Sequence, residues 1–546
     1  MTMRTRTDAL LLAGFCAFLF FYGIGQFGLI GADEPRYAQV AREMLERRDW
    51  ITPVLNGRPW LEKPPLYYWQ AMLAYALLGV SDASARIPSA VDATLLVIAV
   101  YFFFRRFRRG VEVDAALMTA SCTGVISFAR AASMDMALAA TFAIGLLAWW
   151  AWRECENRIY LALFYVCMAL GILAKGPVAP FLAAVVIVLF AAATREWRLV
   201  ARSLWFPGIF LFCAVALPWY LAVQLKNPQF FREFILQHNL ARFSTDLYRH
   251  RQPFWYYLPV TALALMPWTI FVIAAFVEPL QTWWAERKSS PTEPDYELQF
   301  NLFAGCWLVV PIVFFSISQS KLPGYILPAI PAGAVLLAEY LRRRAEPSSK
   351  AEQAVSKWLA VLHALVAAAP IVPALLIVYL VTEHRLPAGR PMLLAVGVAF
   401  VVCAAIAVTL ASRLGLRMLR FITLIPVVLA VAAVFKVGSA AIDQTLSVRP
   451  LAIELASVES HRLPVAVCGV SRELEYGLTF YRDKEIPRYE AGNVPAEEHL
   501  LVASPKWMQD VAKQTAGRRL LLLGHYAPQD VDYYWVAAAS NKTPSP

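Results

Sequence analysis

The chain carries little charge for its length. Of its 546 residues, 16% are Asp, Glu, Lys or Arg, whereas about a quarter of a soluble domain is charged. Hydrophobic residues make up 59%. A water-soluble protein of this size would not combine so much apolar side chain with so little charge. The composition therefore excludes a soluble globular protein and indicates a chain that crosses a membrane many times.

Signals for disulfide frameworks, metal centres and nucleotide-binding loops are also missing. Most of the eight cysteines lie inside apolar segments, and Cys468 stands alone in the polar C-terminal region. There is no CxxC pair, no HxxxH spacing, no internal repeat and no Gly-rich nucleotide fingerprint in the C-terminal region. Glu62 with His238 or His250 is a candidate set for a divalent ion, but no spacing supports it. We therefore expect no required cofactor.

What the sequence does contain is a series of apolar segments long enough to cross a bilayer. We expect thirteen spans. Their approximate cores are residues 8–28, 86–104, 112–128, 135–152, 159–174, 177–193, 203–225, 254–279, 300–316, 323–341, 357–381, 391–411 and 418–436. The first is too long, and too poorly matched to a small-residue cleavage site, for a removed signal peptide, so it is expected to be a membrane anchor.

Basic residues in the short loops predict the orientation of these spans. Arg4 and Arg6 precede the first span, and basic clusters follow the second, sixth and tenth spans at 105–109, 194–202 and 342–344. With thirteen spans all of these lie on one side, which is the cytoplasm. The net charge of +11 is largely this bias. We therefore expect membrane lipids as partners and no nucleic acid.

The chain divides into a membrane domain, residues 1–436, and a soluble domain, residues 437–546, expected on the periplasmic side. Two long outer loops, 29–85 and 226–253, are expected to cover an active site, the first with short helices along the membrane surface. The soluble domain alternates strand-like runs (AVCGV, HLLVAS, RRLLLLG) with helix-like ones. This alternation predicts a small α/β domain.

The stretch GADEPRYAQVAREM places two carboxylates just outside the first span. Asp33 precedes Pro35 and a helical pattern, so it suits a helix N-cap, and the helix start also favours the negative charge of Glu34. A cap alone would explain both residues. The two carboxylates are not alone at this surface, however.

Other ionisable residues lie near the outer span ends or in the outer loops. They are Glu62, Lys63, Asp135, Lys175, Lys321 and an Arg/His cluster that includes His238, Arg249 and His250. A single one of them would be explained as an interfacial side chain. Together they favour a charged cavity at the outer face of the membrane.

Three of these lysines lie on stiff turns. Pro64 follows Lys63, the Gly176-Pro177 pair follows Lys175, and Lys321 comes two residues before Pro323. Proline and glycine at these places favour non-helical turns that hold an ammonium group in place, which suits binding of a phosphate. Outside the cytoplasm there is no nucleotide-sugar supply, so a transferase there would use a polyprenyl phosphate sugar. Cations would stabilise the departing phosphate, and a carboxylate from another loop would act on the acceptor.

The stretches GADEPRYA, LEKPPLYYW and SKLPGYILPAIP, with the Asp135 site, resemble the membrane glycosyltransferases of the GT-C fold. They are similar specifically to the bacterial lipid A aminoarabinose transferases of glycosyltransferase family 83, over residues 1 to about 440. The resemblance implies an all-α polytopic fold with a C-terminal periplasmic α/β domain. It also implies transfer of 4-amino-4-deoxy-L-arabinose from undecaprenyl phosphate to lipid A phosphate at the inner membrane, an inverting reaction that gives polymyxin resistance.

The resemblance also assigns roles to residues. Asp33 matches the catalytic acidic residue, Asp135 the second acidic position and Lys63 the lysine on the donor phosphate. With the residues found above, the candidate site is Asp33, Asp135 and Glu34 for catalysis, Lys63, Arg58, Lys321 and Tyr325 for the donor phosphate, and Glu62, Lys175, His238, Arg249 and His250 in the surrounding cavity.

Two questions stay open at this point. If the acceptor is a phosphate, which is largely ionised at neutral pH, Asp33 would orient it or hold the sugar's amino group, whereas a hydroxyl acceptor would need Asp33 as a base. The acidic pair is shared with protein O-mannosyltransferases, so a protein or glycan acceptor is an alternative. A secondary transporter or flippase is a second alternative, although the charges lie at span ends rather than at the membrane midplane.

Overall fold

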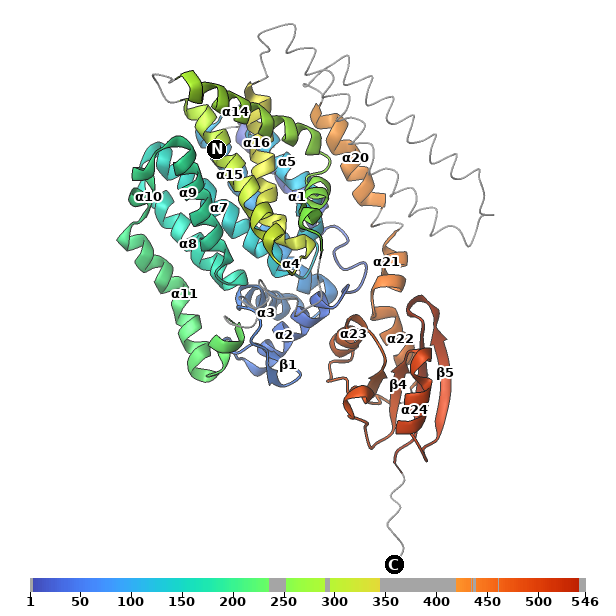
Figure 1. Ribbon diagram of the computed structural model, residues 1–546. Helices are drawn as coiled ribbons and strands as arrows, with labels where there is room; N and C mark the ends of the chain where they lie inside the picture. The colour runs from blue at the N-terminus through green and yellow to red at the C-terminus, as the bar shows by residue number, and fades with distance from the viewer. Residues whose placement is uncertain are drawn as a thin grey trace, which may run out of the picture.

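The computed structural model describes residues 3–234, 252–289, 295–343, 419–433, 435, 438–459 and 461–539. A bundle of helices carries two smaller units at one end, namely the segment between α1 and α4 and a C-terminal sheet domain (Figure 1). The predicted spans 357–381 and 391–411, and the residues His238, Arg249 and His250, lie outside the described residues.

The bundle is built from α-helices with short π and 3-10 turns. They are α1 (Met3–Cys16), η1 (Ala17–Phe21), α4 (Asp82–Phe107), α5 (Glu112–Ser121), α6 (Thr123–Ala129), α7 (Met134–Cys155), α8 (Arg158–Lys175), α9 (Val178–Thr194), α10 (Trp197–Ser203), α11 (Phe206–Lys226), η3 (Phe254–Tyr256), α13 (Tyr257–Ala264), α14 (Thr269–Ser289), α15 (Tyr296–Ile317), η4 (Pro323–Ala329), α16 (Ile330–Arg343) and α20 (Leu419–Ala433).

Six of these helices are long and apolar enough to cross a membrane: α4, α7, α8, α11, α15 and η4 with α16. The chain is therefore an integral membrane protein. A seventh candidate, predicted as one segment over 254–279, is bent by 114° between α13 and α14. Pro267 lies in the break and cannot donate a backbone hydrogen bond, which ends the first helix. α14 then continues to Ser289, ten residues beyond the predicted end of this span at residue 279. The count of thirteen stays a prediction.

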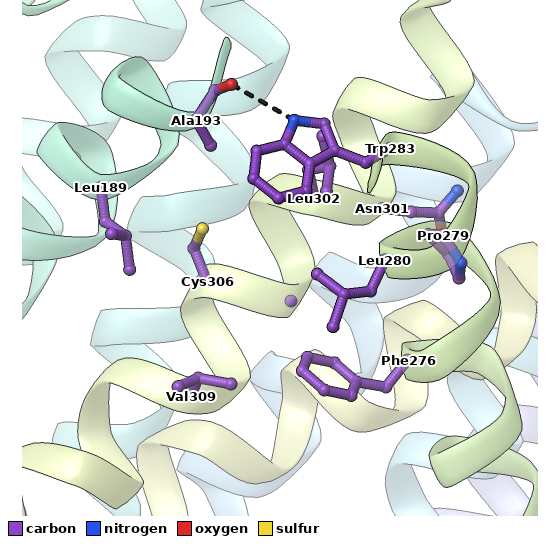
Figure 2. Close-up of a pocket in the computed structure, with 11 residues that line it drawn as sticks. Leu189, Ala193, Phe276, Pro279, Leu280, Trp283, Asn301, Leu302, Cys306 and Val309 are labelled. Atoms are coloured by element: carbon purple, nitrogen blue, oxygen red, sulfur yellow. Dashed lines mark hydrogen bonds between the residues drawn. The ribbon is translucent and has the colours of Figure 1, made fainter. Parts of the chain in front are cut away.

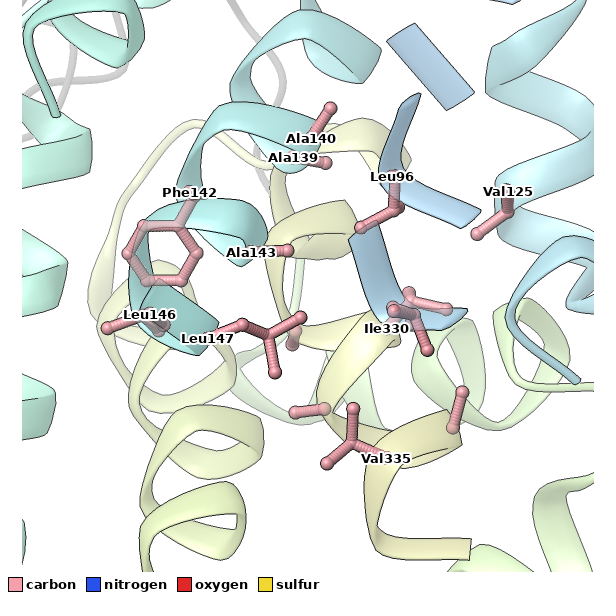
Figure 3. Close-up of a cluster of buried hydrophobic side chains, with 14 of the residues drawn as sticks. Leu96, Val125, Ala139, Ala140, Phe142, Ala143, Leu146, Leu147, Ile330 and Val335 are labelled. Atoms are coloured by element: carbon pink, nitrogen blue, oxygen red, sulfur yellow. The ribbon is translucent and has the colours of Figure 1, made fainter. Parts of the chain in front are cut away.

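Small residues let the helices of the bundle approach closely. Ala139, Ala140 and Ala143 of α7 belong to one buried cluster with Leu96 of α4 and Val335 of α16, on the side of the bundle where α7 packs against η4 and α4 (Figure 3). All five side chains are buried. Alanine faces of this kind are typical of helix interfaces in membranes, where close backbone packing replaces the hydrophobic driving force. α7 is buried along most of its length, which places the helix that carries Asp135 inside the bundle.

The first outer loop folds as predicted into short helices, α2 (Asp33–Arg47) and α3 (Leu66–Leu78), with a hairpin of β1 (Val54–Leu55) and β2 (Arg58–Pro59) between them. Asn56 and Gly57 form the hairpin turn, and both have positive φ, as an Asn-Gly turn requires. Their amides donate to the two carboxylate oxygens of Glu43, at 2.8 and 3.0 Å. The hairpin is therefore fixed to α2.

The C-terminal domain contains a four-stranded mixed sheet in the order β3-β4-β6-β5, in which β3 and β4 are parallel and the other pairs antiparallel. The elements are α21 (Ser439–Leu446), α22 (Arg449–Val458), β3 (Val465–Cys468), α23 (Arg472–Arg482), η7 (Tyr489–Ala491), β4 (His499–Ala503), η8 (Pro505–Trp507), α24 (Met508–Gln514), β5 (Leu520–Tyr526), η9 (Ala527–Gln529) and β6 (Val531–Val536). The three predicted strands are present as β3, β4 and β5. The aromatic strand β6 was not predicted.

Candidate active site

Acidic and basic side chains from distant regions of the chain meet at one end of the bundle. They come from the first turn of α2, the loop before α3, the first turn of α7 and the last residue of α8, and Tyr325 of the turn η4 lies beside them. This is the end that also carries the C-terminal domain (Figure 1).

Asp135 is the centre of one group of contacts. Ser133 caps α7, and its hydroxyl donates to Asp135 Oδ2 at 2.8 Å. Lys175 donates to the other carboxylate oxygen, and its ammonium lies 4.7 Å from the centre of the Tyr325 ring. Gly324 packs so closely that a Cβ there would lie 2.8 Å from Asp135 Cγ. The structure therefore brings together Asp135, Lys175 and Tyr325.

Asp33 is the centre of a second group. Its carboxylate, 55% exposed, pairs with Arg36 one turn later on α2. The Arg36 guanidinium lies 5.2, 5.3 and 5.5 Å from the rings of Tyr37, Trp60 and Tyr476. Burial by itself would lower the pKa of Arg36, but the neighbouring Tyr37, Asp33 and Glu62 raise that pKa on balance. Arg36 is thus a permanent cation beside an accessible carboxylate.

The loop residues Glu62 and Lys63 lie between the two groups. Lys63 is 9% exposed and close enough to Asp135 for their charges to interact. Glu62 interacts in the same way with Arg36. Burial raises the pKa of Tyr37 above its usual range, and the charges of both Asp33 and Asp135 contribute to that shift. Tyr37 therefore lies within electrostatic reach of both carboxylates and connects the two groups.

Glu34 is placed differently from its neighbour Asp33. Arg86, which is fully buried, donates to Glu34 Oε2 at 2.6 Å, and the amides of Ile30 and Ala132 donate to the two carboxylate oxygens at 2.8 Å each. Both oxygens are therefore occupied. Since Ala132 lies three residues before Asp135, Glu34 ties α2 to the start of α7.

Arg58 and Lys321, both predicted to bind the donor phosphate, lie on other elements. Arg58 is exposed on β2. Lys321 is buried and donates to the carbonyl oxygen of Ser318, at 2.5 Å, in the turn after α15. Within the described ranges no three His, Cys, Asp or Glu side chains gather as metal ligands do.

Sequence reasoning missed Arg36, Arg86 and the aromatic residues around them. An arginine at the start of an apolar span, as in DASARIPSA, is a signal for Arg86, because a charge there needs a partner. Arg36 follows Asp33 at helical spacing, which allows an ion pair. No pattern in the sequence points to Tyr476, which lies more than 400 positions away from Arg36.

A separate hollow between α9, α14 and α15 has a volume of about 210 Å³. Figure 2 shows its lining, which includes Leu189, Phe276, Leu280 and Val309, with Trp283 bonded to the carbonyl of Ala193 at 3.3 Å. No charged side chain lines it. It faces the first half of α15, away from η4. It is therefore an apolar groove between helices and does not belong to the charged site.

The known proteins to which this chain is similar are glycosyltransferases. The family described as dolichyl-phosphate-mannose-protein mannosyltransferase matches residues 8–232. The undecaprenyl phosphate-α-4-amino-4-deoxy-L-arabinose arabinosyl transferase of Pseudomonas aeruginosa is 31% identical over 349 residues, 62% of this chain and 60% of the relative. The corresponding transferase of Photorhabdus laumondii is 31% identical over 342 residues, which are 61% of this chain and 59% of that relative. The aligned region thus spans about three-fifths of these relatives.

Among solved structures, ArnT from Cupriavidus metallidurans bound to undecaprenyl phosphate is similar with a TM-score of 0.76 and 22% identity, covering 98% of this chain and 99% of that one. The structure of the same protein in the apo state is similar with a TM-score of 0.73 and 22% identity, and the match covers 97% of this chain and 98% of that one. The chain therefore has the fold of ArnT over nearly its whole length, and the predicted resemblance to aminoarabinose transferases is confirmed.

Proposed function

We propose that this protein transfers 4-amino-4-deoxy-L-arabinose from undecaprenyl phosphate to a phosphate group of lipid A. The observation that carries the proposal is the meeting of two carboxylate–cation pairs, Asp33 with Arg36 and Asp135 with Lys175, on the fold of ArnT. The sequence similarity to the arabinosyl transferases supports the sugar and the donor.

The reaction breaks the bond between the anomeric carbon and the donor phosphate and forms a bond from that carbon to an acceptor oxygen. Undecaprenyl phosphate leaves as an anion, so its new charge needs cations nearby. Lys63, on the loop before α3, fits this role, and Arg36 and Lys175 add positive charge. In an inverting displacement the acceptor attacks from the face opposite the phosphate.

Asp33 is the carboxylate we assign to the acceptor side, because it is the more accessible one. A lipid A phosphate is already largely ionised at neutral pH and needs little deprotonation. Asp33 would then hold the acceptor or the amino group of the sugar. Asp135 with Lys175 and Tyr325 forms the other wall of the site, and Glu34 positions the two carboxylates through Ala132.

The reaction is proposed for the periplasmic face of the bacterial inner membrane. The arginine-rich turns predicted to be cytoplasmic lie at the other end of the bundle, where Arg108 pairs with Glu154 and Arg202 with Glu156. The proposed domains are the membrane domain, residues 1–436, with the loops 29–85 and 226–253 as the cover of the site, and the periplasmic domain, residues 437–546. The expected phenotype is resistance to polymyxin.

The test is mass spectrometry of lipid A from a polymyxin-sensitive host that makes the donor but lacks its own transferase. Three proteins are compared at matched membrane levels: the parent, Asp33→Asn and Glu46→Gln. Glu46 is a matched control, because it lies on the same helix, is 54% exposed and pairs with Arg42. The parent and Glu46→Gln should add a pentosamine, and Asp33→Asn should not. Unmodified lipid A with the parent would overturn the proposal.

A second acceptor is favoured by one observation, the match of the mannosyltransferase family to residues 8–232, which include Asp33 and Asp135. A protein or glycan hydroxyl would then be the acceptor, and Asp33 would remove its proton. Glycosylated protein or glycan, appearing in the same host while lipid A stays unmodified, would support this second function.

A further inference from the structure

We infer that the C-terminal domain contributes directly to this active site, with Tyr476 of α23 as a positioning residue for Arg36. The inference rests on the proposed function and adds to it a role for a domain in which the sequence shows no motif. Three sets of contacts support it.

The first set fixes the chain just before α2. Arg86, from the membrane domain, donates to the carbonyls of Ile24, Phe27 and Gly28 at 2.8 to 3.0 Å. From the other side Arg449, at the start of α22, donates to the carbonyls of Gly25 and Gln26 at 3.2 and 2.8 Å. Two arginines from opposite sides thus hold one short stretch that leads to Asp33.

The second set joins the same stretch to α23. The hydroxyl of Tyr481 donates to Asp82 at 2.6 Å and accepts from the amide of Leu29 at 2.8 Å. The amide of Gly28 donates to Asp443 at 2.7 Å. A Cβ on Gly28 would collide with Ser447 and Tyr481. Only glycine permits this close approach, so the two domains meet in one defined position.

The third set packs α23 along α2. Arg42 pairs with Asp483 at 2.7 Å and donates to the carbonyl of Phe480. One end of α23 is thereby placed against the second half of α2. Tyr476, two turns earlier on α23, then lies against Arg36, in the first turn of α2. The two helices therefore run in the same direction, and their contact continues up to the active site.

Tyr476 completes an aromatic cage around a cation. Arg36 is 13% exposed, and its Nε is buried without a hydrogen-bond partner among the described residues. Three rings, those of Tyr37, Trp60 and Tyr476, surround the guanidinium and leave one of its edges for Asp33. Of the three, only the Tyr476 ring comes from the C-terminal domain. Its loss would let the guanidinium move away from Asp33 and from the donor phosphate.

The test uses the full chain in nanodiscs with undecaprenyl phosphate as the binding probe. Tyr476→Ala should weaken binding roughly tenfold, the effect of losing one desolvated cation–π contact. Tyr476→Phe keeps the ring and should bind within about twofold of the parent. Leu521→Ala, a truncation on the exposed side of β5, is the control in the same domain and should bind like the parent.

A double-mutant cycle separates positioning from general support. In an Arg36→Ala background, adding Tyr476→Ala should change binding less than about twofold, because the ring acts through Arg36. Equal losses in both backgrounds, or a Tyr476→Ala variant that binds like the parent, would overturn the inference. If the parent itself does not bind the probe, the proposed function fails separately.

In that case hydrogen exchange tests the inference by itself. Tyr476→Ala should speed the exchange of backbone amides at residues 33–37, whereas Leu521→Ala should not. Unchanged exchange at these residues in Tyr476→Ala would overturn the inference.

Discussion

Asp33 and Glu34 are adjacent carboxylates with opposite surroundings. Successive residues of a helix point about 100° apart, so one faces the open site and the other faces the core between α2, α4 and α7. The exposed Asp33 carboxylate pairs with Arg36, whereas Glu34 is 9% exposed and accepts from Arg86 and two backbone amides. Substitutions at the two positions should therefore affect different properties.

Glu34→Gln is expected to destabilise the protein, whereas Asp33→Asn is not. A glutamine offers one acceptor oxygen where Glu34 has two, so an amide group would face the backbone N–H of Ile30 or Ala132, and Arg86 would lose its counter-charge. Removing one partner of a buried ion pair costs about 3–5 kcal/mol. Thermal unfolding of the purified protein measures the difference. Equal melting temperatures for the two variants would contradict this account of Glu34.

Gly324→Ala is expected to lower the transfer rate without unfolding the protein. The added Cβ would lie 2.8 Å from Asp135 Cγ and from the ring of Phe128, so Asp135 would have to move. Displacing a reacting group by about 1 Å can cost roughly 100-fold in rate. Gly14→Ala is the control, because nothing lies within 4 Å of its added Cβ. Equal transfer rates for the two variants in membranes would show that Asp135 needs no such precision.

At the scale of elements, β4 begins with a buried histidine. His499 Nδ1 donates to the carbonyl of Glu497 at 2.8 Å, and Nε2 accepts from the hydroxyl of Tyr489 at 2.6 Å. In the neutral ring Nδ1 is the donor and Nε2 the acceptor, so both partners are satisfied without a second ring proton. Burial lowers the pKa of His499 below its usual value. The start of β4 is therefore held by a group that resists protonation.

The C-terminal sheet is accordingly expected to lose stability in mild acid. In the unfolded chain His499 would bind a proton near its ordinary pKa of about 6.5, whereas in the fold it binds one only at lower pH. Its contribution is therefore complete above that ordinary pKa and is lost as the pH falls through the lowered one. Hydrogen exchange at β4 between pH 7 and 5 measures this loss, and His499→Gln should flatten the pH dependence. An unchanged slope would exclude His499 as its source.

At the scale of the whole molecule, the two ends of the bundle carry different sets of charged side chains. One end carries the site residues and the C-terminal domain (Figure 1). The other carries arginines paired with carboxylates, among them Arg153 with Glu196 and Arg342 with Glu297. Arginines gathered at one end are typical of the cytoplasmic side of a membrane protein. The proposed orientation can therefore be tested without knowing the substrate.

Two single-cysteine variants are expected to label from opposite sides of the membrane. Cys155 is exposed at the end of α7, far from Asp135 in the first turn of the same helix. With Cys155 as the remaining cysteine, a membrane-impermeant maleimide should react only after the inner membrane is opened. With Glu473→Cys on the exposed start of α23 as the remaining cysteine, it should react in spheroplasts. The reverse pattern would place the active site in the cytoplasm.

Much of the local structure follows from the sequence, because hydrophobic periodicity and turn residues act over short distances. The helices α2 and α3, most of the apolar helices and three of the four C-terminal strands fall where their patterns predict. One prediction failed because a distant residue intervened. The segment 112–128, predicted as one span, breaks at Cys122, where the amide of Thr123 bonds to the carbonyl of Met266 instead of continuing the helix.

By itself the sequence determined that the chain lies in a membrane, which residues carry charge beside the spans, and that two carboxylates follow the first apolar segment. Only the tertiary structure decided which charge pairs with which. Arg86 joins Glu34 across 52 positions, Lys175 joins Asp135 across 40, and Tyr476 reaches Arg36 from the other end of the chain. The physical reason is that charge pairs depend on distance in space, which the packing of helices sets and which no short-range pattern records.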